Sequence, residues 1–182
     1  MARPPFDERK ATQVAARFLA AAPGQRLPYL KLIKLMYFAD REALLRWGAP
    51  ITNDRYYSLD HGPILSRVKD LMVEDHAERS FWSAHISSPS SYVIELLDEA
   101  GNDRLSRAEE QLIDETYARY RHFDRWELRE MSHELPEWTD PHGSAIEIEI
   151  EDILRAGGVS ARQRDAIVRE LDGYRKMQAL SD

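Results

Sequence analysis

One segment near the N-terminus is apolar around most of a helical turn, and it constrains the fold more than any other feature. From Tyr29 to Gly48 the sequence reads YLKLIKLMYFADREALLRWG. A narrow polar stripe runs through Lys31, Lys34, Arg41 and Glu42. A helix that is hydrophobic on nearly every face must be contacted on several sides by the rest of its domain. The sequence therefore predicts a central buried helix that ends at Gly48.

The residues after this helix predict a strand and then another helix. An extended aromatic run, RYYSL, spans residues 55–59, and His61-Gly62-Pro63 follows it. Proline is favoured at the first position of a helix, where its missing N–H costs nothing. We therefore expect a helix to restart at this Gly-Pro hinge and to continue through residues 64–72.

Composition limits what kind of protein this is. The chain has 182 residues, 43% of them hydrophobic, which is enough for one domain with a substantial core. Its apolar runs are too short to span a membrane, and no signal-peptide core follows the N-terminus, so we expect a cytoplasmic protein. The absence of cysteine excludes disulfides, thiolate metal ligands and cysteine nucleophiles. A net charge of −7 disfavours nucleic acid as the main ligand.

Further helices are indicated by apolar periodicity and by capping sequences. A first helix is expected over residues 7–22, where apolar positions recur with helical spacing. Capping boxes at residues 106–109, 124–127 and 160–163 predict the starts of three later helices, and Pro136 is expected to end the middle one.

Two segments have the alternating pattern of strands. Residues 82–86 and 92–96 are separated by the turn-rich sequence SSPSS, and we expect them to join the strand around Tyr56 in a three-stranded antiparallel sheet. Residues 146–150 also alternate, whereas residues 150–154 fit a short helix, so an extended lead-in followed by a helix is the favoured interpretation. The predicted fold class is α+β, mostly α, with a single domain over residues 1–182.

Three segments in a fixed order resemble the Panacea domain, also called the SocA-like domain. The first is KLIKLMYFA at residues 31–39, and the second is HGPI at residues 61–64, after the aromatic strand. The third is LREMSHE at residues 128–134, followed by Trp138. The resemblance covers about residues 10 to 155, with a C-terminal helix expected over 160–178. The matched motif positions are Lys31, Lys34, Tyr37, Gly62, Pro63 and His133.

This resemblance implies a mostly helical fold with a small antiparallel sheet, in agreement with the patterns above. It also implies an antitoxin, since members are associated with bacterial and phage toxin–antitoxin systems and neutralise protein toxins by direct binding. At least one type is an adaptor that delivers its toxin to an ATP-dependent protease. We therefore expect a protein toxin, encoded nearby, as partner, and an AAA+ protease as a further partner in the adaptor alternative.

The chain departs from the family pattern in two places. Many members have Trp-Lys-Tyr or a similar triplet before Gly-Pro, where this chain has Leu59-Asp60-His61, and this leaves the identity of the partner open. No appended DNA-binding module is evident, which disfavours autorepression by this chain alone.

Motifs typical of enzymes are missing, so we expect neither catalytic residues nor a cofactor. The sequence has no GxSxG elbow and no phosphate-binding glycine loop. His133-Glu134 begins like a zinc-binding HExxH motif, but the position of the second histidine is Glu137, so no metal site is expected. A small enzyme with an unrecognised site remains the alternative.

Several residues are candidates for contact with a partner. Tyr56 and Tyr57 should point to opposite faces of their strand, and the outward one is the best candidate. Arg67 lies on the helix expected after the hinge. His61 either fixes the turn through a backbone hydrogen bond or presents a protonatable group, and Trp138 either covers the core, which we favour, or is an exposed anchor.

The two motif lysines have both a structural and a functional interpretation. Lys31 and Lys34 could bind an acidic partner or pair with an internal carboxylate such as Glu42. In a third arrangement, which we favour, the aliphatic part of each side chain lies along the protein surface and the amine stays in water.

Overall fold

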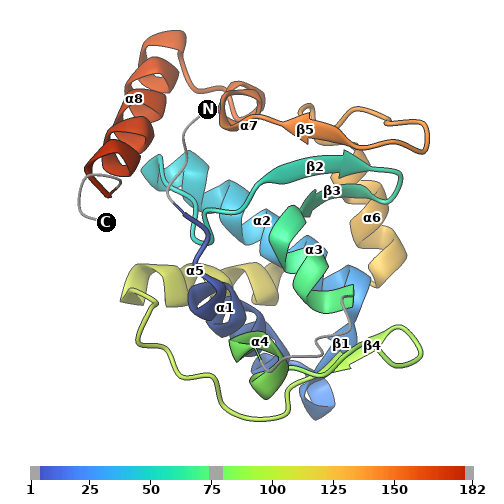
Figure 1. Cartoon of the computed structure of the whole chain (residues 1–182). Coiled ribbons are helices and arrows are strands. Elements are labelled where there is room, and N and C mark those ends of the chain that lie inside the picture. Colours follow the sequence, from blue (N-terminus) through green and yellow to red (C-terminus); the bar gives the residue numbers. More distant parts are fainter. Residues whose placement is uncertain (1–4, 74–79, 179–182) are drawn as a thin grey trace.

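The predicted apolar helix lies at the centre of the structure, with helices and a small sheet around it (Figure 1). The computed structural model describes residues 5–73 and 80–178. Helices from both halves of the chain pack on α2, and so does the hairpin strand β3. The central helix and the helices that pack on it are α2 (Tyr29–Trp47), α1 (Glu8–Ala21), α5 (Arg107–Tyr120), α6 (Arg125–His133) and α7 (Ile150–Ala156).

The ends of α2 follow from its sequence. Pro28 precedes its first residue, and Gly48 ends it in the left-handed conformation, with φ of 72° and its N–H bonded to the Leu44 carbonyl. Most of the helix between these residues is buried. The prediction of a central buried helix that ends at Gly48 is confirmed.

The remaining helices are short or lie at the C-terminal end of the described chain. They are η1 (Pro23–Gln25), α3 (Ser66–Val73), α4 (Phe81–His85) and α8 (Ala161–Gln178). All three predicted capping boxes are present as reciprocal hydrogen bonds at the starts of α5, α6 and α8. Among the described residues, no helix combines the length and the apolarity that a membrane crossing would need.

The strands form a three-stranded antiparallel sheet and a separate two-stranded ribbon. In the sheet, β2 (Tyr56–Leu59) lies between β3 (Gly62–Leu65) and β5 (Ile146–Ile148). In the ribbon, β1 (Arg26–Pro28) pairs with β4 (Val93–Glu95). The α+β, mostly α fold class is confirmed, and so is the strand-then-helix reading of residues 146–154. The expected partners of the Tyr56 strand were wrong, since residues 92–96 belong to the ribbon.

The segment 82–86 is not a strand, which corrects one sequence-based prediction. Residues 82–85 belong to α4, Phe81–His85, which begins with a capping box at Ser80, and Ile86 follows as its C-cap and forms an isolated β-bridge with Leu96. The two most buried side chains of the segment, Trp82 and Ile86, are four residues apart. That spacing fits one face of a helix as well as one face of a strand, so periodicity alone could not distinguish them.

The Gly-Pro hinge starts a strand and not a helix, which is a second correction. Pro63 lies in β3, an edge strand, where its missing N–H leaves no gap in the sheet. Helix α3 begins three residues later because the Asp54 carboxylate accepts hydrogen bonds from the backbone N–H groups of Arg67 and Val68, each at 2.9 Å. A distant carboxylate thus caps this helix, and nothing in the local sequence indicated it.

The backbone at Gly62 should tolerate no side chain. Its φ is 94°, and a Cβ there would lie 2.7 Å from Lys34 Nζ and even closer to Ser132 Oγ. Gly62→Ala should therefore lower the free energy of unfolding by more than the ~1–2 kcal/mol of left-handed strain alone. Gly158→Ala is the matched control, since Gly158 has φ of 80° and no described atom near its absent Cβ. Equal losses in urea titrations of the two variants would contradict the close packing at Gly62.

Candidate functional site

The three motif segments of the sequence meet at one place inside the protein. Lys34 Nζ on α2 donates to the Pro63 carbonyl of β3 at 2.8 Å. Tyr37, one turn further along α2, donates its hydroxyl to Glu137 at 3.0 Å. The third contact comes from Trp138, whose indole Nε1 donates to the Leu59 carbonyl at 3.1 Å. These hydrogen bonds connect the first motif to the second, the first motif to the loop that follows α6, and Trp138 of the third motif to the strand that precedes the second.

The loop after α6 is held by further polar contacts. Arg41 forms a salt bridge with Glu137, whose side chain is fully buried, at 2.6 Å from Nε to Oε1. His133 stacks on Trp138 with ring centroids 4.0 Å apart and an angle of 14° between the planes. Trp138 is half-buried, its ring stacks on His133 and its N–H is hydrogen-bonded, which agrees with the favoured prediction that it covers the core. Burial, together with the nearby Arg129 charge, lowers the pKa of His133.

The favoured arrangement of the motif lysines, with amines in water, was wrong. Lys34 is fully buried, and Lys31 is buried with its amine bonded to the carbonyls of Arg121 and Phe123, at the C-terminal end of α5. Lysine often satisfies such terminal carbonyls. Glu42, the expected internal partner, instead pairs with Arg46. The motif lysines therefore connect elements of the scaffold and are not displayed to a partner.

A second buried network fixes the tyrosine that points inward. Tyr56 is fully buried, and its hydroxyl donates to Asp40 Oδ2 at 3.1 Å. Burial raises the pKa of Asp40 to about 6, although Thr52 donates to it from both its hydroxyl and its backbone N–H. Tyr57 is the outward residue of the pair, half-exposed beneath the Arg55 guanidinium. Alternation along β2 is confirmed, and of the two tyrosines only Tyr57 is accessible to a partner.

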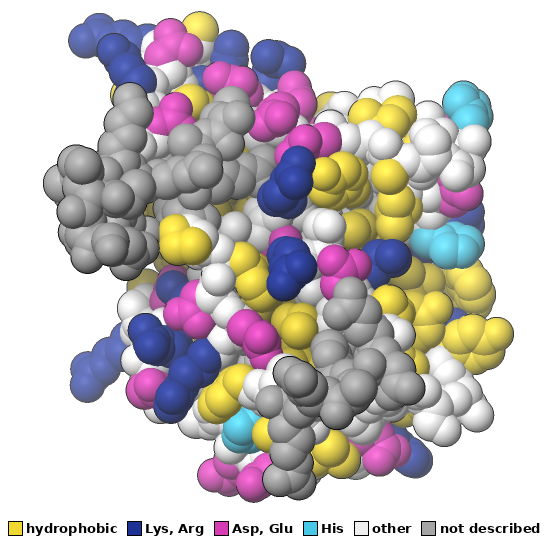
Figure 2. Space-filling model, viewed as in Figure 1, with side chains coloured by type: hydrophobic (Ala, Val, Ile, Leu, Met, Phe, Trp, Pro, Cys, Tyr) yellow, Lys and Arg dark blue, Asp and Glu magenta, His cyan; other side chains and the backbone are white. Residues whose placement is uncertain are grey.

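An open groove of about 710 Å³ lies beside the hinge, on the outer side of this scaffold. Its floor is apolar and mostly buried, and its rim carries aromatic and cationic side chains. We call it the aromatic groove, with the floor Leu30, Ile33, Ile64 and Met72 and the rim Tyr29, His61, Lys69, Tyr92, Arg125 and Trp126. Figure 2 shows hydrophobic side chains gathered in this part of the surface, between α6 and the hairpin of β4.

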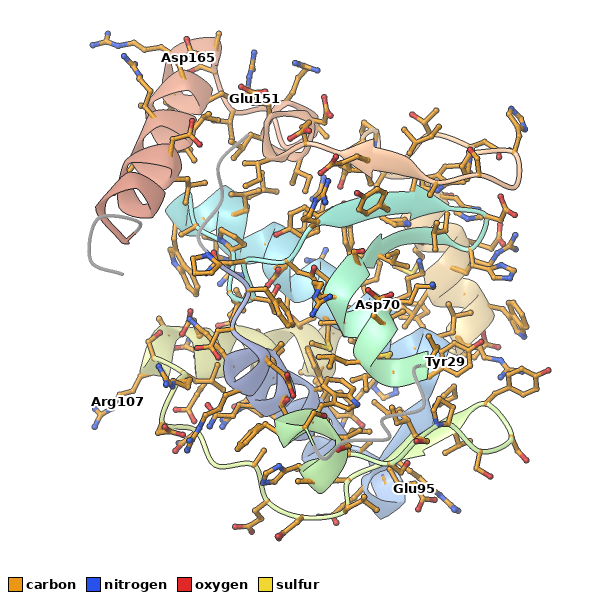
Figure 3. All side chains as sticks on the ribbon, viewed as in Figure 1. Tyr29, Asp70, Glu95, Arg107, Glu151 and Asp165 are labelled. Carbon is orange, nitrogen blue, oxygen red and sulfur yellow. The ribbon has the colours of Figure 1, made fainter. Side chains whose placement is uncertain are left out.

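The aromatic rim is a connected row of ring contacts. Tyr29 and Tyr92 stack with centroids 6.3 Å apart, and Arg125 lies over the rings of both Tyr92 and Trp126. Trp126 in turn meets the edge of His61 at 6.1 Å. Tyr29 stands beside the end of α3, the helix that carries Asp70 (Figure 3). Tyr92 and Trp126 are nevertheless 64% and 48% exposed, which makes them available as anchors for another molecule.

Tyr92 is also held in a strained conformation. Its φ is 66°, in the left-handed region that large side chains rarely adopt. Ser91, with φ of 49°, and Tyr92 are the two central residues of a tight hairpin turn between Ser90 and Val93, whose backbones exchange hydrogen bonds in both directions at 2.9 Å. Such a turn requires a positive φ at both central residues. The turn and the stacking on Tyr29 place the Tyr92 ring on the groove rim.

Some of the residues predicted to contact a partner lie at the aromatic groove, and others lie outside it. His61 lies on the groove rim, and it is exposed, with its ring against Trp126 and not against backbone. Tyr57 is directly opposite Ile64 in the sheet, so it shares the face from which the groove floor is built. Arg67 is exposed on α3 near Phe6, outside the groove lining. Whether these residues contact a partner remains a prediction.

Sequence reasoning missed most of the groove. Trp126 follows the helix cap Asp124, and a tryptophan in the first turn of a polar helix is a recognisable sign of exposure. Tyr92 follows a run of serines, which indicated a turn. Their meeting depends on the β1–β4 ribbon, which brings Tyr92 next to Tyr29, and the sequence did not predict that ribbon.

The buried Lys34 amine makes the stability of the fold depend on pH. Burial, and then the Arg129 charge, lower its pKa from 10.5 to about 7. Between those pH values the unfolded chain holds a proton that the folded chain has released, so the contribution of Lys34 to the free energy of unfolding should rise with pH. It should be smallest below pH 7, where the fold must bury an ammonium.

Lys34→Met removes this titration and keeps an apolar chain of similar length. The free energy of unfolding of the native chain, minus that of the variant, should increase between pH 7 and 10.5 in urea titrations. A difference that stays constant across this window would contradict the burial of Lys34 in its neutral form.

Comparison with known proteins agrees with the arrangement of the motifs. A family model described as "Antitoxin SocA-like, Panacea domain" matches residues 32–139. No curated protein and no solved structure matches the chain. The matched segment is more than half of the chain and contains the hinge, α6 and most of the groove rim. The chain therefore belongs to the SocA-like antitoxin family of Panacea-domain proteins.

Proposed function

We propose that this protein is the antitoxin of a toxin–antitoxin system and that it neutralises a protein toxin by binding it in the aromatic groove. The family match supports an antitoxin role in general. The observation that supports the aromatic groove as the toxin-binding site is the row of exposed aromatic side chains around an apolar floor. Tryptophan and tyrosine dominate the energy of protein interfaces, especially when they surround a site from which water is excluded.

The rigidity of the elements that form the groove favours binding. Trp126 lies on α6, Tyr29 on α2 and Met72 on α3, and the motif hydrogen bonds fix the hinge among them. Side chains that are ordered before binding lose less conformational entropy when a partner docks. We propose that the toxin is inhibited by steric occlusion, without chemical change, and that the antitoxin acts by binding and not by catalysis.

The proposal predicts that removing Trp126 disables neutralisation. Trp126→Ala should weaken toxin binding by ~2 kcal/mol or more, since a large exposed aromatic anchor is lost. Trp47→Ala is a matched control, because Trp47 is 45% exposed and lies at the other end of α2 from Tyr29. The measurement is growth of a bacterial host that co-expresses the toxic product of the adjacent reading frame, with antitoxin levels checked by immunoblot.

Rescue should be lost with Trp126→Ala and retained with Trp47→Ala. Tyr57→Ala extends the test to the neighbouring sheet face and should weaken rescue less. The half-life of the toxin in the same cells should be unchanged by the antitoxin, whereas delivery to a protease would shorten it. A non-toxic neighbour, or rescue that survives Trp126→Ala, would contradict the proposal.

A further inference from the structure

The rim of the aromatic groove carries two cations, Arg125 and Lys69. Within the described residues, neither Arg125 nor Lys69 forms a salt bridge, although acidic residues outnumber basic ones by 32 to 25 in the whole chain. Arginines elsewhere do find carboxylates, for example Arg17 with Asp114 and Arg55 with Glu147. The groove therefore presents positive charge on an acidic protein.

The acidic residues nearest to Arg125 are already engaged. Asp124 accepts hydrogen bonds from the backbone N–H groups of Trp126 and Glu127. Glu127 returns the contact by accepting from the backbone N–H of Asp124 at 2.7 Å. The capping box of α6 thus holds both carboxylates, which keep their negative charge, while the Arg125 guanidinium lies over aromatic rings.

Among the described residues that line the groove, Asp60 is the single carboxylate. Asp60 accepts a hydrogen bond from the Gly143 N–H at 2.9 Å, on the loop that closes one end of the groove. Asp60 keeps its negative charge there, so the described lining carries two cations, Arg125 and Lys69, against one carboxylate, beside the exposed ring of His61.

Arg125 is held in a position that suits a carboxylate. Its guanidinium carbon lies 5.4 Å from the Tyr92 ring centroid and 5.0 Å from that of Trp126. A guanidinium that rests on aromatic faces keeps its N–H edge free, and this edge matches the two oxygens of a carboxylate. The apolar floor next to it suits bulky hydrophobic side chains.

We propose that the aromatic groove recognises an acidic-apolar segment of the toxin, in which bulky hydrophobic side chains have Asp or Glu beside them. This inference deepens the proposed function and rests on it. Aromatic rings with arginine also suit stacked nucleobases, but a strand of phosphates would be repelled by a chain of net charge −7. A protein segment brings only the few negative charges that the rim can neutralise.

The experiment uses displayed random linear peptides, selected on the purified full-length protein and then measured singly by fluorescence anisotropy. The selected peptides should combine aromatic or large aliphatic residues with adjacent acidic ones. Arg125→Gln should weaken their binding about tenfold or more, as expected when one charge-assisted pair is lost. Arg125→Glu should bind poorly to the acidic peptide and recover affinity for the same peptide with Lys in place of the acid.

Arg107→Gln is the matched control. Arg107 is the first residue of α5 after its cap, as Arg125 is of α6, and it lies on the opposite side of the molecule from Tyr29 (Figure 3). This variant should bind the peptides like the native chain, and thermal melting should show that all variants are folded.

Selection of neutral or basic peptides, no selection at all, or affinity unchanged in Arg125→Gln would overturn the inference. Binding of a labelled oligothymidine as tight as that of the best peptide would also overturn it. The outcomes are separate from those for the proposed function. If rescue depends on Trp126 but not on Arg125, toxin binding stands and the acidic segment is refuted. If acidic peptides bind but rescue is insensitive to Trp126, the groove chemistry stands and the antitoxin mechanism is refuted.

Discussion

The hydrogen bond from the buried Lys34 amine to the Pro63 carbonyl is the contact on which the rest of the structure depends. It attaches the β2–β3 hairpin to the central helix at the point where Gly62 leaves no room for a side chain. The contacts of Tyr37 with Glu137 and of Trp138 with Leu59 attach the loop after α6 to the same place. Burying an amine is costly, and it is tolerated because the amine becomes neutral near pH 7 and keeps an acceptor.

This arrangement separates the residues that build the scaffold from those that face outward. The motif residues that identify the family lie within or beside the buried cluster, where they position α2, the hinge and α6 relative to one another. Apart from His61, the groove rim is formed on the outer side of this scaffold by residues outside the motif segments, such as Trp126 and Tyr92. Substitutions on the rim could therefore change what the groove binds without disturbing the motif residues that hold the scaffold together.

Much of the fold could be predicted from the sequence because its signals are local. The apolar circumference of α2, the capping boxes and the alternation in Tyr56 and Tyr57 each depend on nearby residues, and each was confirmed. The errors arose where a distant group decided the outcome. Asp54, which precedes the β2–β3 hairpin, caps α3 beyond it, so the helix begins after the Gly-Pro hinge. The motif lysines are buried because their amines donate to the backbone carbonyls of Phe123 and Pro63. The groove was missed for the same reason, since it requires Tyr29, Tyr92 and Trp126 to meet from three separate segments.

The central claim is that a protein partner occupies the aromatic groove while the motif cluster stays internal. Amide hydrogen exchange of this chain, alone and with the toxic product of the adjacent reading frame, tests it most directly. The account predicts that added protection is concentrated in residues 59–64, 69–73, 91–93 and 124–127, the segments that form the groove. Protection confined to α8 and the Trp47 end of α2, with these segments unchanged, would contradict it.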